Sequence, residues 1–167
     1  MNKFNSLFWV KSSLVSLYLA LTIPIPFISI EKFKVYSIIL FILGLILIID
    51  ITNDYVETCD KKITYKSSFT SKLFGKKGWQ IFWKDIKSIK SLSTSQGSKV
   101  FYFTTNKNEN FLVPQRLENL EIFFSIVLKN TDLKVKNLSY ISPLWTYKLL
   151  TCISILMVIG EILTISI

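Results

Sequence analysis

The sequence contains no histidine and only two cysteines, Cys59 and Cys152. Without imidazole the chain cannot build the common zinc and haem sites, and histidine cannot act in acid–base catalysis. The two cysteines fall in a charged part and in an apolar part of the chain, so no disulfide between them is expected. These absences exclude the chemistry that depends on histidine, and they point to no metal and no cofactor.

Charged side chains are nearly missing from residues 12–53 and again near the C-terminus. Ser12–Ile30 and Val35–Ile49 are apolar runs that only the short link of residues 31–34 separates. A hydrocarbon core of about 30 Å needs about 20 helical residues. The sequence therefore predicts an antiparallel transmembrane hairpin within residues 1–53.

The first apolar run has two further features. A cleaved signal peptide is the alternative to a spanning helix, but the run is too long and no small-residue cleavage site follows it. Pro24 and Pro26 lie in its second half, where each removes a backbone donor. We expect an uncleaved helix whose end is kinked or unwound.

A third apolar run, Leu149–Ile167, predicts a C-terminal transmembrane helix within residues 144–167. Two aromatic residues and Lys148 precede it, which is typical of a membrane interface. Glu161 is its only charge, and an ionised carboxylate is costly inside a bilayer. Either Glu161 pairs inside a complex, or it is protonated, or it reaches the far interface. It is a candidate intramembrane polar contact.

The lysines that flank these segments are unevenly distributed, and their distribution predicts the orientation. On one side lie Lys3, Lys11, Lys61, Lys62, Lys136 and Lys148, and on the other lie Lys32 and Lys34. The positive-inside rule then places the N-terminus and the middle region in the cytoplasm or stroma. The C-terminus is expected on the opposite side of an inner or thylakoid membrane.

Residues 54–143 carry charge at the density of a soluble domain and predict an antiparallel β meander. Turn residues, including residues 75–78 and 95–98, separate six short runs rich in β-branched and aromatic residues. The predicted strands are Tyr55–Thr58, Ile63–Phe69, Trp79–Trp83, Ile86–Leu92, Val100–Thr105 and Asn110–Val113. After them, residues 116–130 have the spacing of an amphipathic helix that can cap the sheet. The predicted fold class is a membrane protein of α+β type.

The segment Trp79–Ile89 ends in the step Asp85-Ile86-Lys87-Ser88-Ile89. An aromatic strand with this step, placed after a pair of apolar helices, resembles bacterial membrane-anchored pleckstrin-homology-like domain proteins. The order of the elements is also similar to the photosystem I assembly factor of cyanobacteria and chloroplasts. The three-helix layout is similar to the proteins that help attach haem to cytochrome b6. The resemblance implies a pleckstrin-homology-like domain and an assembly role in a photosynthetic complex, and it supplies no catalytic residue.

A group of cations and aromatics in the middle domain is a candidate binding site. It consists of Lys72, Phe74, Lys76, Lys77 and Trp79. Such a group suits anionic lipid headgroups or an acidic protein near a membrane. The alternative is a solvated hairpin loop.

No residue pattern in the sequence predicts catalysis. The carboxylates of residues 54–143 show no paired spacing with a base, and Gly75–Gly78 lacks the Ser or Thr of a phosphate loop. The net charge of +9 alone would admit nucleic acid. However, Phe101–Phe103 must alternate between two faces of a strand, so a stacking platform is not indicated, and nucleic acid is not an expected partner.

Three functions follow from these patterns. The first is a non-enzymatic assembly or scaffold factor for a membrane protein complex, with the bilayer and membrane-protein subunits as its partners. The second is a module that binds anionic lipid. The third is a small transporter or channel subunit, for which three helices and one internal acid provide little pathway.

Overall fold

The computed structural model describes residues 1–94, 99–133 and 142–166 of the chain. It has an α+β fold that divides into two compact units. The β unit contains Met1–Leu7 and Asn53–Pro143, and the helix unit contains Phe8–Thr52 and Leu144–Ile167. The first seven residues thus group with the β unit, whereas the boundaries expected from the sequence kept them with the hairpin.

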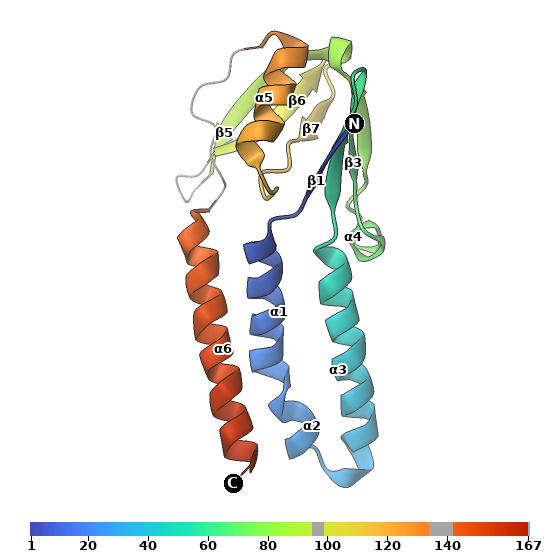
Figure 1. Ribbon diagram of the computed structural model, residues 1–167. Helices are drawn as coiled ribbons and strands as arrows, with labels where there is room; N and C mark the ends of the chain where they lie inside the picture. The colour runs from blue at the N-terminus through green and yellow to red at the C-terminus, as the bar shows by residue number, and fades with distance from the viewer. Residues whose placement is uncertain (95–98, 134–141, 167) are drawn as a thin grey trace. The chain divides into compact units, whose positions relative to one another are not determined.

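The helix unit holds three stretches that are long and apolar enough to cross a membrane: Phe8–Ile28, Glu31–Ile51 and Leu144–Ile165. Its helices are α1 (Phe8–Thr22), α2 (Pro24–Ile28), α3 (Glu31–Ile51) and α6 (Leu144–Ser166) (Figure 1). The first stretch is interrupted between α1 and α2, where Pro24 lacks the amide that would continue the helix. The expected break in the first helix is confirmed.

Small and hydroxylic residues line the packing of α1 against its neighbours. The buried positions of α1 are Val10, Ser13, Ser16 and Ala20, and those of α6 are Thr151 and Ser154. Within a bilayer, small residues let helix backbones approach closely, and hydroxyl groups can bond to backbone carbonyls. The α1 and α6 helices run side by side in the same direction, and α3 runs back along α1 (Figure 1).

Tyr18 joins α1 to α3. Its hydroxyl donates a hydrogen bond to the Phe41 carbonyl over 2.7 Å, and its ring stacks on that of Phe41. Gly44 makes room for this contact, because a Cβ atom there would overlap the Tyr18 hydroxyl. The hairpin is therefore fixed by a specific contact as well as by its short link.

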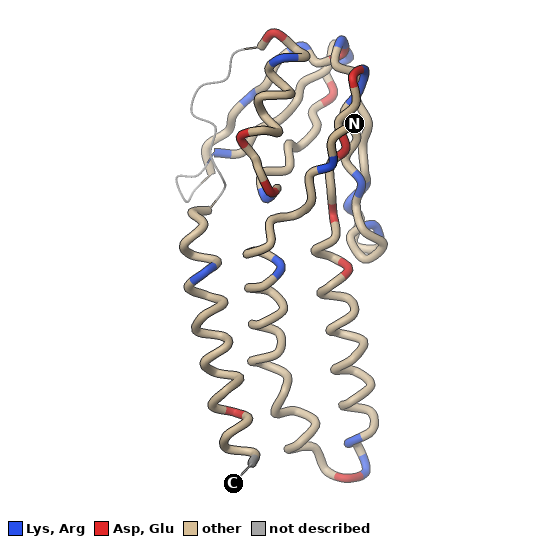
Figure 2. Tube along the Cα trace, viewed as in Figure 1, with Lys and Arg blue, Asp and Glu red and all other residues tan. Residues whose placement is uncertain are grey.

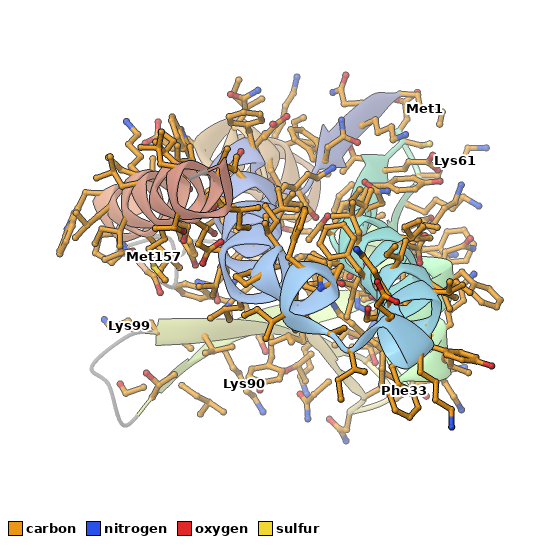
Figure 3. The ribbon with its side chains drawn as sticks, turned by 90° about the horizontal axis from the view of Figure 1, so that it is seen from below. Met1, Phe33, Lys61, Lys90, Lys99 and Met157 are labelled. Carbon is orange, nitrogen blue, oxygen red and sulfur yellow. The ribbon has the colours of Figure 1, made fainter. Side chains whose placement is uncertain are left out.

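The remaining helix surface is apolar and exposed in the isolated chain. No residue of α3 is buried, and Phe33 and Met157 point outward from their helices (Figure 3). Charges are sparse along the helices and frequent in the β unit (Figure 2). Such apolar surface is what a helix presents to lipid.

The β unit begins with a strand that precedes the first helix. This strand, β1 (Asn2–Asn5), pairs antiparallel with β2 (Tyr55–Thr58). The sheet continues through β3 (Lys62–Lys66) and β4 (Trp79–Phe82) in the order β1-β2-β3-β4. The strand β1 was not predicted from the sequence, and its pairing with β2 brings residues far apart in the chain together.

A second antiparallel sheet follows the short helix η1 (Trp83–Asp85). It contains β5 (Ile86–Ser93), β6 (Lys99–Thr105) and β7 (Asn110–Leu112), in that order. The helix α5 (Leu120–Thr131) completes the core through Phe123 and Phe124, both almost fully buried. Phe123 meets Phe4 of β1, and Phe124 meets Phe101 of β6, in edge-to-face contacts. The strands predicted between residues 55 and 113 and the capping helix are thus confirmed in type and order.

Three points differ from the prediction. The strands form two sheets, β1 to β4 and β5 to β7, instead of one continuous meander, because the short helix η1 separates β4 from β5. The strand expected over Ile63–Phe69 ends at Lys66, because Ser68 caps the short helix α4 (Phe69–Leu73). The capping helix starts at Leu120 rather than at residue 116, after Asn119 in a left-handed conformation. The predicted turn over residues 95–98 and the flanking Lys136 lie outside the described residues.

Candidate functional site

Asp54 is the centre of a polar cluster in the β unit. Its side chain accepts hydrogen bonds from the Tyr65 hydroxyl, from the Ser68 amide over 2.8 Å and from the Ser71 hydroxyl over 3.0 Å. Lys76 completes the cluster as an ion-pair partner. These contacts connect Asp54, which immediately precedes β2, to β3 and to both ends of the segment that contains α4.

The environment of Asp54 favours its ionised form. Burial by itself raises the pKa of a carboxyl group, and Asp54 is only 7% exposed. The hydrogen bonds from Lys76, Tyr65 and the Ser68 amide, with the charge of Lys76, outweigh this effect, so the pKa of Asp54 lies below its ordinary value. Burial, and then the hydrogen bond to Asp54 and its charge, raise the pKa of Tyr65. The cluster therefore contains an ionised carboxylate at neutral pH. We call Asp54 and its partners Tyr65, Ser68, Ser71 and Lys76 the Asp54 clamp.

The clamp holds a short projecting segment with an apolar surface, which we call the α4 tip: Phe69, Lys72, Leu73, Phe74 and Lys77. Thr70 and Ser71 are buried, so the helical turn directs the apolar residues outward. Phe69, Leu73 and Phe74 are 77%, 73% and 74% exposed. Phe69 and Leu73 are one helical turn apart and Phe74 follows directly, and exposed apolar side chains grouped in this way make the segment a candidate interaction site.

The structure separates the residues that the sequence analysis grouped with this segment. Lys72, Phe74 and Lys77 belong to the tip and are exposed. Lys76 is bound to Asp54, and its ammonium lies over the Tyr65 ring at 5.2 Å. Trp79 packs on the core against Tyr65 and Phe103. The binding role predicted for all five remains a prediction, but Lys76 and Trp79 also have structural tasks.

Sequence reasoning overlooked Phe69, Leu73 and Asp54. A usable signal existed for the first two, because Ser68 is a favoured residue for a helix N-cap, and Phe69 and Leu73 after it are one turn apart. No local signal marks Asp54. Its partners lie 11 to 22 positions further along the chain and meet it only in the folded state.

A second candidate surface lies on the outer side of the β5-β6-β7 sheet. Phe101 and Phe103 of β6 face the core, so Val100 and Tyr102 face outward. Leu92 pairs with Val100 and Leu112 with Tyr102, so all four share the outer face. We call Leu92, Val100, Tyr102 and Leu112 the outer-face patch.

The outer-face patch is partly exposed and borders β5, whose outer edge pairs with no other strand among the described residues. Leu92 and Leu112 are 59% and 48% exposed. Lys90, next to Tyr102 in register, also stands on this face (Figure 3). The strand β5 pairs with β6 on one side, with a register shift between Ile86 and Ser88, and with no other described strand on the other side. An open edge beside apolar side chains is a template for an added strand.

The side chains of Glu161 and of the two cysteines were also singled out in the sequence. Glu161 lies in α6, and its Oε2 atom has no hydrogen-bond partner among the described residues. Cys59 and Cys152 are free thiols in different units. Among the described residues, no group of three His, Cys, Asp or Glu side chains could hold a metal ion.

The chain is similar to the uncharacterized protein slr0269 of Synechocystis sp. (strain ATCC 27184 / PCC 6803 / Kazusa). The two are 27% identical over 155 residues, which cover 89% of this chain and 77% of that protein. No protein-family model matches the chain, and no solved structure matches it. The similarity extends over both units, and it is compatible with a membrane location in an organism that has thylakoids.

Proposed function

We propose that this chain is a non-enzymatic, membrane-anchored scaffold or assembly factor for a membrane protein complex. The observation that carries the proposal is the outer-face patch beside the open edge of β5, on a domain joined to three candidate membrane spans. The β unit binds the partner subunit, and the helices keep it at the membrane. The two antiparallel sheets and α5 support the further proposal that the β unit is pleckstrin-homology-like.

The chemistry of the surface suits a protein partner. Its centre is apolar, and Lys90 provides a charge at its rim. A partner strand that adds to β5 gains main-chain hydrogen bonds, and its side chains gain apolar contacts with Leu92 of that strand. Leu112 lies on β7, at the other edge of the sheet, and contacts a partner that covers the outer face. A photosynthetic complex, such as photosystem I or the cytochrome b6f complex, is the client that we propose, since the similar protein comes from a cyanobacterium.

Purification in mild detergent tests the proposal. The tagged full-length chain should co-purify with defined subunits of a membrane complex, and its deletion should lower the amount of that assembled complex. A variant with Leu92→Glu and Leu112→Glu should lose the subunits, because charge on the patch opposes burial in an interface.

The matched control is Ile122→Glu, since Ile122 is 55% exposed and lies on α5 instead of the outer face. It should retain the partner. A chain that purifies with lipid alone, or equal retention by the patch and control variants, would contradict the proposed function.

The alternative function, an anionic-lipid-binding module, is favoured by the exposed apolar and basic residues of the α4 tip. Purification of the full-length chain with anionic lipid and without defined protein subunits would favour it over the scaffold.

A further inference from the structure

The exposed side chains of the α4 tip have defined positions, because hydrogen bonds fix the backbone of the segment that carries them. The Ser68 hydroxyl accepts from the Ser71 amide over 3.2 Å and caps the helix. The Phe74 amide bonds to the Thr70 carbonyl over 3.1 Å, and Gly75 then turns with a φ of 82°. The Lys76 amide bonds back to the Ser71 carbonyl over 2.9 Å. Hydrogen bonds therefore fix the backbone of the tip at both of its ends.

The residue that holds the α4 tip, Asp54, lies close in the chain to the end of a candidate membrane span. Asp54 comes three positions after Ile51, the last residue of α3. Three residues of chain reach at most about 10 Å. The headgroup layer on each side of a hydrocarbon core is about 5–8 Å thick. If α3 spans the membrane, the residue that holds the tip is therefore at or near the headgroups.

The composition of the tip matches that layer. Phe69, Leu73 and Phe74 supply apolar surface, and Lys72 and Lys77 supply positive charge at exposed positions. Lys76 is not counted among the cations that face lipid, because it forms an ion pair with Asp54. A short segment of aromatic, aliphatic and basic side chains is the combination that binds shallowly to anionic membranes.

We propose that the α4 tip inserts Phe69, Leu73 and Phe74 into the headgroup region of the membrane in which α3 is anchored, with Lys72 and Lys77 against anionic lipid. The tip is then an attachment point of the β unit in addition to its covalent links to the helices. It restricts the rotation of the β unit above the bilayer. This inference does not depend on the identity, or the existence, of a protein partner.

Site-specific fluorescence in nanodiscs tests this insertion. The full-length chain, with Cys59→Ser and Cys152→Ser, receives one cysteine at Phe74 for an environment-sensitive fluorophore. A second protein carries the label at Lys107, an exposed residue between β6 and β7. In nanodiscs of purified lipid, aqueous iodide should quench the label at 74 several-fold less than the label at 107. A lipid with a spin label near its headgroup should quench the label at 74 more.

Charge reversal tests the role of the lysines. With Lys72→Glu and Lys77→Glu, iodide quenching at 74 should rise in nanodiscs rich in anionic lipid. The matched control, Lys84→Glu with Lys107→Glu, changes the charge equally at exposed positions outside the tip and should leave it unchanged. Equal protease resistance of the variants would show that each is folded.

Three results would overturn the proposal. The first is equal iodide access at 74 and 107. The second is iodide quenching of the label at 74 that is the same in neutral and anionic nanodiscs and that does not change when Lys72 and Lys77 are replaced. The third is shielding in native membranes but not in nanodiscs, because a protein would then cover the tip. The nanodiscs contain no partner, so failure here is distinct from failure of the scaffold proposal.

Discussion

At the scale of single residues, Asp54 illustrates how a buried charge can be used to position a surface. Its carboxylate has an ion-pair partner and three other hydrogen-bond donors. A buried carboxylate without such partners would destabilise the fold. With them, it fixes a segment that contributes exposed side chains instead of core.

We predict that Asp54→Asn lowers the free energy of unfolding by about 1.5–3 kcal/mol at neutral pH, the usual worth of hydrogen bonds to a charged group. Urea unfolding of the full-length protein in detergent, followed by tryptophan fluorescence, measures it. Asp60→Asn is the control, since Asp60 is exposed in the turn before β3, and it should change little. Equal stability of the two variants would show that the clamp does not stabilise the fold.

The same residue predicts a pH dependence. Because the pKa of Asp54 is lowered on folding, its contribution is complete above the unfolded-state pKa of about 3.9 and is lost as the pH falls through the folded-state value. The unfolding free energies of the wild type and of Asp54→Asn should therefore converge as the pH is lowered below about 4. A constant difference between them down to the acid limit would contradict the lowered pKa.

At the scale of elements, α5 requires an apolar residue on its buried face, and the α1–α3 contact requires a small residue. Phe123 of α5 is fully buried, whereas Glu121 on the same helix is exposed. We predict that Phe123→Asp removes the protease resistance of the β unit, because it buries an unpaired charge. Glu121→Lys should keep the resistance. Limited proteolysis of the full-length variants decides this, and identical digestion would show that this face is not core.

The α1–α3 contact predicts an effect of a single methyl group. Gly44→Ala overlaps the Tyr18 hydroxyl and should destabilise the helix unit by about 1–3 kcal/mol, as overpacking does. Tyr18→Phe should relieve part of this loss in the double variant. Gly160→Ala is the matched control, because a Cβ atom there meets no atom within 4 Å. The measurement is unfolding in mixed micelles, and equal effects of the two alanines would contradict the contact.

The sequence predicted the elements that carry a repeating pattern. The strands from Tyr55 onward alternate in polarity, and α5 has an apolar stripe, so their type could be recognised. The strand β1 has a single apolar residue, Phe4, and no period to detect. The five-residue helix α4 depends on Ser68 and on contacts with Asp54, which precedes it by more than ten positions. Both short elements were missed, β1 because it has no pattern and α4 because Ser68 marks only its start and its other determinants are distant contacts.

At the scale of the whole molecule, the chain passes between the two units three times. The crossings are at Leu7–Phe8, Thr52–Asn53 and Pro143–Leu144. The start of α1, the end of α3 and the start of α6 lie at the same end of the helix unit (Figure 1). If the helices span a membrane, the β unit and the N-terminus are on one side of it and the C-terminus is on the other.

Reporter fusions test this topology. A reporter after Leu138 and one after Ile167 should report opposite sides of the membrane, with the first in the cytoplasm or stroma, as the lysine distribution predicts. Fusions that report the same side would show that α6 does not span. The assignment of α6 as a third span would then be wrong, whatever the function of the β unit.

The proposed scaffold has one contact that can be measured directly, the contact between the outer-face patch and a membrane-protein subunit. A photo-crosslinking amino acid placed at Leu112, and separately at Ile122, captures neighbours in intact membranes. Position 112 should give a discrete adduct with an integral membrane protein, and position 122 should give none. Absence of an adduct at 112, or the same adducts from both positions, would contradict the account.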